Sequence, residues 1–99
     1  MNENRVKLVL RSAEENISVL INKFLDAETL SALDLYWWWD PSQNWWVNKK
    51  YVNRALKILV EEQCLKRISA IGRDGIGYRK TEEFVNLLQK ILQIEDLLK

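Results

Sequence analysis

The sequence predicts a mainly helical α+β domain that contains one small β-hairpin. Apolar residues recur every three or four positions in several long segments, which places them on one side of an α-helix. Between residues 65 and 80 this spacing gives way to two short runs rich in β-branched and aromatic residues. The 99 residues suffice for one domain and are too few for two, so we expect a single domain over residues 1–99.

The two ends of the chain carry heptad-like apolar stripes. The spacing predicts one helix over residues 3–25 and another over 81–99, the latter capped by Thr81. Together they have more apolar surface than one small domain needs, so we expect a twofold homodimer; one helix folding against the other within a single chain is the alternative. The expected dimer contacts are Val6, Leu10, Ala13, Ile17, Leu20, Phe24, Leu87, Ile91, Ile94 and Leu98.

Three further helices are expected between these ends. Asp26 is a candidate N-cap for a second helix that ends near Trp39. The run Asp40-Pro41-Ser42-Gln43 predicts a short third helix through Trp46, or alternatively a turn. Asn48 is expected to cap a fourth helix over 48–62.

The fourth helix has two different faces. Its apolar residues fall at helical spacing on one side, while lysines, an arginine and an asparagine occupy most of the other. After it, strands over 65–71 and 76–80 flank Gly72-Arg73-Asp74-Gly75, which is a hairpin signal.

The net charge of +1 hides an uneven distribution. Residues 49–80 carry nine Lys and Arg against three Asp and Glu, whereas residues 1–48 and 81–99 are both net acidic. Such asymmetry points to an anionic partner, and a solvated basic face with no partner is the alternative.

Five tryptophans lie within residues 37–46. Core and dimer packing is the simplest interpretation, because tryptophan buries a large area. Helical geometry prevents Trp37, Trp38 and Trp39 from all facing one core, so at least one should be exposed or at an interface. An effector pocket, a patch for a partner protein and base stacking remain as functional alternatives.

The order of elements and two separated segments resemble winged helix-turn-helix regulators of the MarR, PadR and ArsR kinds. Residues 52–67, VNRALKILVEEQCLKR, look like a recognition helix followed by the first wing strand. Residues 73–84, RDGIGYRKTEEF, are similar to the wing, its second strand and the start of the closing helix. The resemblance implies a winged-helix core over 26–80, a dimerisation helix over 1–25 and another over 81–99.

The chain departs from that family at two places. Gln63 stands where the family usually has Gly after the recognition helix, so we expect this helix to end in a different way. The preceding helix, normally rich in Ala and Leu, is here the short and unusual segment 42–46.

The resemblance and the basic residues together predict double-stranded DNA binding by a transcription regulator, with helix 48–62 in the major groove and hairpin 66–80 as the wing. We expect phosphate contacts from the lysines and from Arg79, adenine recognition by Asn53, guanine recognition by Arg54, and entry of Arg73 into a minor groove. The predicted DNA-binding residues are Lys49, Lys50, Asn53, Arg54, Lys57, Arg73, Arg79 and Lys80.

Other functions find less support. With no histidine and a single cysteine, Cys64, we expect no metal site, no cofactor and no catalysis. No apolar run approaches the length that spans a membrane, and the lone thiol fits a cytoplasmic location. Two alternatives stay open: a protein-interaction module that uses the Trp-rich segment 37–46 without binding DNA, and binding of structured RNA through the same basic face.

Overall fold

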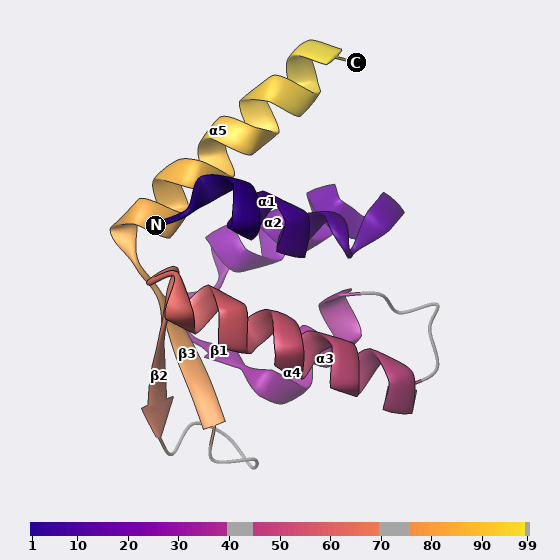
Figure 1. Cartoon of the computed structure of the whole chain (residues 1–99). Coiled ribbons are helices and arrows are strands. Elements are labelled where there is room, and N and C mark those ends of the chain that lie inside the picture. Colours follow the sequence, from indigo (N-terminus) through magenta and orange to yellow (C-terminus); the bar gives the residue numbers. More distant parts are fainter. Residues whose placement is uncertain (40–44, 70–75, 99) are drawn as a thin grey trace.

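The computed structural model describes residues 1–39, 45–69 and 76–98, which form several helices with a small sheet at one edge of the molecule (Figure 1). The mainly helical α+β class is therefore confirmed. In chain order the elements are α1 (Glu3–Arg11), the 3-10 turn η1 (Glu14–Asn16), α2 (Ile17–Asp26), β1 (Leu30–Ser31), α3 (Ala32–Trp39), α4 (Trp45–Glu61), β2 (Leu65–Ser69), β3 (Ile76–Lys80) and α5 (Glu82–Leu98).

The strands form an antiparallel sheet in the order β1-β3-β2. The predicted hairpin is confirmed by a register that runs from Leu65 opposite Lys80 to Ser69 opposite Ile76. Strand β1 was not predicted; it pairs Leu30 with Tyr78 and Ser31 with Gly77 on the other side of β3. The turn at 70–75, including Arg73, lies outside the described residues.

The prediction of one continuous helix over residues 3–25 is wrong. Helix α1 ends at Arg11, where the amide and the hydroxyl of Ser12 both donate to the carbonyl of Val9. A side chain that bonds the backbone in this way competes with the regular helical ladder. The chain continues through η1 into α2, so the two halves of the apolar stripe enter one core from separate helices.

Most of the residues expected at a dimer interface lie in or against the core of the single chain. Val6, Leu10, Ala13, Leu20 and Phe24 are at most 1% exposed, and Leu87 is 3% exposed. Ile17 and Ile91 pack against this core at its edge, while the side chains of Ile94 and Leu98 lie outside the described set. These side chains are therefore used for packing within the single chain, and the dimer stays a prediction.

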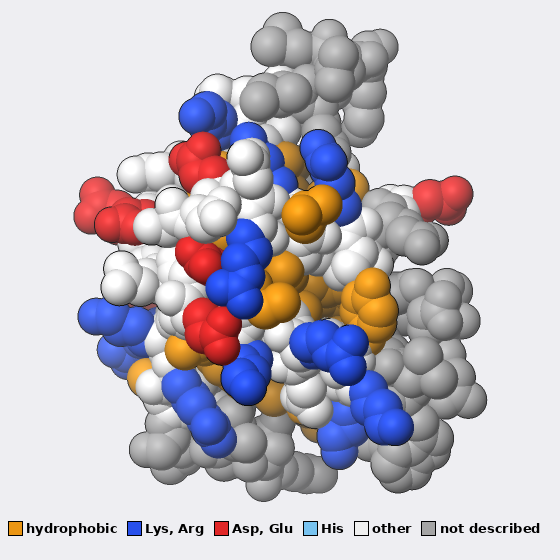
Figure 2. Space-filling view, in the orientation of Figure 1, with side chains coloured by type: hydrophobic (Ala, Val, Ile, Leu, Met, Phe, Trp, Pro, Cys, Tyr) orange, Lys and Arg blue, Asp and Glu red, His pale blue; other side chains and the backbone are white. Residues whose placement is uncertain are grey.

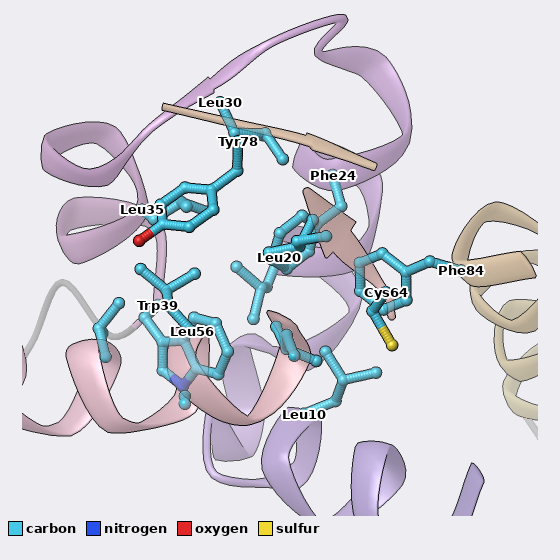
Figure 3. Close-up of a cluster of buried hydrophobic side chains, with 14 of the residues drawn as sticks. Leu10, Leu20, Phe24, Leu30, Leu35, Trp39, Leu56, Cys64, Tyr78 and Phe84 are labelled. Atoms are coloured by element: carbon cyan, nitrogen blue, oxygen red, sulfur yellow. The ribbon is translucent and has the colours of Figure 1, made fainter. Parts of the chain in front are cut away.

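Aromatic side chains hold several elements around one centre (Figure 3). The ring of Phe24 on α2 meets Trp39 of α3 edge-on at 6.3 Å and Phe84 of α5 at 5.3 Å. Such edge-to-face pairs add to the stabilisation that burial itself gives. Helices far apart in the sequence are therefore fixed relative to one another. Helix α4 packs against the same core through Leu56.

Two predicted helix starts are also wrong. Asp26 is the last residue of α2 and not a cap, and α3 begins six residues later, where the Ser31 hydroxyl accepts from the amide of Asp34. Helix α4 begins at Trp45, so Asn48 lies inside it. Residues 40–44, the start of the expected short third helix, lie outside the described residues.

The end of α4 is formed by a left-handed residue, contrary to our expectation. Gln63 has φ 62°, its amide donates to Val60, and the next amide, of Cys64, donates to Leu59. This pair of bonds is the Schellman arrangement, which glycine normally completes. Gln63 therefore ends the helix in the usual geometry and bears the steric cost of a side chain there.

Candidate functional site

Helix α4 presents a polar, positively charged face to solvent. Its inner side is buried at Val52, Ala55, Leu56 and Leu59, which sit in the core. The exposed residues on the other side, spaced three and four apart so that they share one face, are Lys50, Asn53, Arg54 and Lys57. The prediction that this side of the helix faces solvent is confirmed. Lys49, predicted with them, is half-buried.

The two strands of the hairpin add cations next to this helix face. Lys66 on β2 and Arg79 on β3 are exposed and are register partners, directly opposite each other. Like charges in that position destabilise a sheet when nothing neutralises them. Figure 2 shows Lys and Arg side chains over α4 and beside the strands on the same face of the molecule.

Sequence reasoning missed two of the hairpin cations. Lys66 and Arg67 are both exposed, and neither was among the predicted site residues. Alternation along β2 was the available signal for Lys66: Leu65 is buried, so its neighbour lies on the opposite face of the sheet. The exposed cationic surface, defined here as Lys50, Arg54, Lys57, Lys66 and Arg79 together with Asn53, thus spans one helix and two strands. Arg67 is also exposed, but it lies on the opposite face of β2 to Lys66, across from Tyr78.

Lys80, expected to contact phosphate, has a different role. Its ammonium donates to the carbonyl oxygens of Phe24, Leu25 and Ala27 at 2.5–2.8 Å. These carbonyls lie at the end of α2, where a helix leaves its last acceptors unpaired. The ammonium group is bonded to backbone carbonyls of the same domain, so Lys80 does not belong to the exposed cationic surface.

Asn53 is tied to the neighbouring helix α3. The hydroxyl of Tyr36 donates to Asn53 Oδ1 at 2.6 Å. Tyr36 is 8% exposed, whereas Asn53 is exposed. The hydrogen bond therefore reaches from the packed side of α3 to the solvent side of α4 and limits how the amide of Asn53 can turn.

A shallow groove of about 320 Å³ lies between α1 and α4, beside the exposed cationic surface. Its lining is mostly apolar, and Leu8 and Tyr51 on its rim are 65% and 55% exposed. Arg54 lines the same groove. The arginine thus lies where the cationic face meets an apolar hollow.

The acidic end of α4 is paired with the N-terminal segment of the chain. Arg5 forms ion pairs with Glu61 at 3.0 Å and with Glu62 at 2.8 Å. The backbone amide of Asn2 donates to Glu62 at 2.7 Å, and this bond together with Arg5 lowers the pKa of Glu62. Glu61 and Glu62, at the C-terminal end of α4, are therefore held by contacts with Asn2 and Arg5.

The three consecutive tryptophans of α3 lie in three different environments, as helical geometry predicted. Trp37 is 53% exposed, and Trp39 is buried with its indole N–H donating to the Ser12 hydroxyl at 2.9 Å. Trp38 is half-buried, with the ammonium of Lys23 5.7 Å from its ring centre. The side chains of Trp45 and Trp46 lie outside the described set.

Other kinds of site find no support in the described part of the chain. Within residues 1–39, 45–69 and 76–98, no group of three His, Cys, Asp or Glu side chains is placed to hold a metal ion. Over the same ranges, no helix has the length and apolar character needed to cross a membrane. The thiol of Cys64 is buried, which raises its pKa to about 12.

No family model, curated protein or solved structure matches this chain in the three comparisons. The described residues and their arrangement are therefore the basis for a function.

Proposed function

We propose that the chain is a winged-helix transcription regulator that binds double-stranded DNA sequence-specifically. In this proposal α4 is the recognition helix in the major groove and the β2–β3 hairpin is the wing. The order α3-α4-β2-β3 supports it, because two consecutive helices followed by an antiparallel hairpin are the order expected for a recognition helix and its wing.

The observation that carries the proposal is the outward face of α4. A helix fits the major groove of B-DNA, and a face that reads it needs cations for phosphate together with groups that bond base edges. On this face Lys50 and Lys57 are the cations for phosphate, and Asn53 and Arg54 are the groups that can bond base edges. All four are exposed, and they lie on one side of a helix whose opposite side is anchored in the core.

The hairpin supports an anionic partner independently of the helix. Lys66 and Arg79 face each other at a cross-strand position where like charges repel. A phosphate placed between them would remove this repulsion. Arg79 thus keeps its expected phosphate role, and Lys66 joins it.

The proposal includes a twofold homodimer in the cytoplasm. Helix α5 extends beyond the layer formed by α1 and α2 (Figure 1), and its sequence continues the apolar stripe through Ile94 and Leu98. A dimer through this outer part would leave the core intact and bring two α4 helices to a pseudo-palindromic site. Light scattering on the purified protein tests it: a mass of about twice 11.8 kDa supports the dimer, and the mass of one chain contradicts it.

Duplex selection from a random library, repeated at two salt concentrations, tests the DNA function. We expect an enriched motif, and affinity that falls steeply with salt because counterions are released from phosphate. Lys50→Ala should weaken all duplexes alike and reduce the salt slope by about 1, while Arg54→Ala should also relax the preference at one base pair.

The matched control is Lys90→Ala, an exposed lysine on α5, which should bind as the unaltered protein does. Absence of binding to any duplex at low salt would contradict the proposal. Preference for structured RNA over the selected duplex would redirect it to RNA.

One observation favours a second candidate, a protein-interaction module. Trp37 and Leu33 are one turn apart on α3 and are 53% and 42% exposed, so two large apolar side chains lie on one exposed face of this helix. A partner protein docked on α3 would cover both. This candidate predicts a hetero-complex that Trp37→Ala abolishes and Lys50→Ala leaves intact, without affinity for DNA; a selected DNA motif would contradict it.

A further inference from the structure

The amide of Asn53 is oriented by a neighbouring helix before any ligand arrives. The Tyr36 hydroxyl holds Asn53 Oδ1 at 2.6 Å, a normal distance for a well-formed O–H···O bond. Because Tyr36 is 8% exposed and belongs to the hydrophobic core, its ring has little room to turn and its hydroxyl stays near one position. The oxygen of the Asn53 amide is thereby directed to α3, while the side chain as a whole is exposed to solvent.

This orientation changes what Asn53 can read. A carboxamide that recognises adenine must present both its oxygen and its NH2 group to the base, accepting from N6 and donating to N7. The oxygen of Asn53 keeps a second lone pair, but its bond to the Tyr36 hydroxyl turns it toward α3, so a base in the groove would meet the NH2 group first. Such a group suits a base edge made of acceptors, and guanine presents two of them, O6 and N7, in the major groove.

The neighbours of Asn53 place this donor where a base edge would lie. Lys50 and Lys57 are three residues before and four residues after it, so they share its face one turn away on each side. Both are exposed cations suited to phosphates. The uncharged donor is thus flanked by the groups that would hold the backbone on either side of the groove.

We infer that Tyr36 is a positioning residue that makes Asn53 a donor-only reader, selective for a base with major-groove acceptors, guanine above adenine. The inference rests on the proposed DNA binding and replaces the adenine recognition expected from the sequence. Tyr36 acts through Asn53 and need not touch the DNA.

Duplex selection with Tyr36→Phe, which removes one oxygen atom, tests this role. The unaltered protein should prefer guanine to adenine at one position of the selected site. In Tyr36→Phe the ratio of the two affinities at that position should fall about tenfold, and in Asn53→Ala the preference should disappear. Affinity averaged over random duplexes should stay within about twofold, because the phosphate contacts are unchanged. The matched control is Tyr78→Phe, a tyrosine of similar burial on β3, which should keep the preference.

The possible outcomes separate this inference from the proposed function. If the protein selects a motif but Tyr36→Phe leaves every base preference unchanged, or if adenine is preferred at the position that Asn53→Ala relaxes, only the inference is overturned. If no duplex binds, both are overturned. A merely structural role for Tyr36 would lower affinity for all duplexes together and leave the preference intact, which also contradicts the inference.

The hydrogen bond can be measured without DNA. In the nuclear magnetic resonance spectrum of the free protein, Tyr36→Phe should shift the side-chain NH2 signals of Asn53 and bring them closer to those of a freely rotating asparagine. Tyr78→Phe should leave them in place. Unshifted signals in Tyr36→Phe would show that Asn53 is not held by the hydroxyl and would overturn the inference at its first step.

Discussion

The ammonium nitrogen of Lys80 lies 2.7 Å from the carbonyl oxygen of Phe24, on a helix 56 residues earlier in the chain. The same ammonium reaches the carbonyls of Leu25 and Ala27, so a single side chain closes the end of α2. Positive charge near the C-terminus of a helix also interacts favourably with the helix dipole. This contact joins the hairpin to the N-terminal helices and sets Lys80 apart from its exposed neighbour Arg79.

Replacing Lys80 should therefore reduce stability. Lys80→Met keeps the length and apolar stem of the side chain but leaves three carbonyls without their donor, and hydrogen bonds to charged groups contribute about 1.5–3 kcal/mol each. We expect the free energy of unfolding in urea to fall by about 2 kcal/mol or more. Lys66→Met, an exposed lysine of the same hairpin, should change it by about 0.5 kcal/mol or less. Equal effects of the two substitutions would contradict the structural role of Lys80.

Gln63 is the one described non-glycine residue with a positive φ. Because its backbone already has the left-handed conformation that glycine adopts without strain, Gln63→Gly should stabilise the protein by about 1 kcal/mol. This gain corresponds to about 4–8 °C in the melting temperature of a domain of this size.

Gln89→Gly provides a control of opposite sign. Gln89 is exposed within α5, where glycine costs about 1 kcal/mol relative to a good helix former. Thermal melting followed by circular dichroism measures both variants. A lower melting temperature for Gln63→Gly would mean that the side chain of Gln63 contributes more than its strained backbone costs.

Local signals in the sequence predicted the local features of the fold. The hairpin follows from two short β-rich runs separated by a glycine-bearing turn, and its register confirms it. The cap of α5 is equally local, since the Thr81 hydroxyl accepts from the amide of Phe84 three residues later. The exposed side of α4 follows from residues that repeat every three or four positions.

Features that depend on distant parts of the chain were missed. Strand β1 is two residues long and exists because β3, more than 45 residues later, offers it an open edge. The apolar stripe of residues 6–24 predicts burial but not the partner, because its periodicity fits a core within one chain as well as a seam between two. The end of α1 at Arg11, which lets two separate helices enter one core, is not visible in that periodicity.

The candidate site was predictable in composition but not in the partners of its residues. Counting charges identifies Lys80 as a cation of the hairpin. Its hydrogen bonds to the carbonyls at the end of α2 depend on tertiary structure, which no local sequence pattern predicts. Asn53 likewise shows the right chemistry for a base edge, while its hydrogen bond comes from Tyr36, 17 positions away on α3. What a polar residue can bind is therefore fixed by contacts that tertiary structure creates.

Glu62 should make stability depend on pH. Its pKa is lowered in the folded protein by the Asn2 amide and by Arg5, so the carboxylate stabilises the fold above the ordinary value of 4.5. This contribution is lost as the pH falls through the lowered folded value and the group protonates. Glu62→Gln should thus lower the urea midpoint at about pH 7 and have a much smaller effect at about pH 3.

Glu28→Gln serves as its control, because Glu28 is exposed in the loop between α2 and β1. It should leave the urea midpoint nearly unchanged at both pH values. If Glu62→Gln lowered the midpoint equally at both pH values, the effect would come from the altered shape of the side chain and not from its charge.

Cys64 should be nearly inert while the protein is folded. It is the residue after the left-handed turn at Gln63, its side chain is fully buried, and burial raises the pKa of its thiol to about 12. The thiolate is the reactive form, so alkylation by iodoacetamide at about pH 8 should be at least about a hundredfold slower than in urea-unfolded protein. A Cys64→Ala chain that carries Gln89→Cys, on the exposed side of α5, should react at the unfolded rate in both conditions. Mass spectrometry follows the reaction, and rapid labelling of folded Cys64 would mean that the junction between α4 and β2 opens readily, which the paired bonds of Gln63 and Cys64 to α4 argue against.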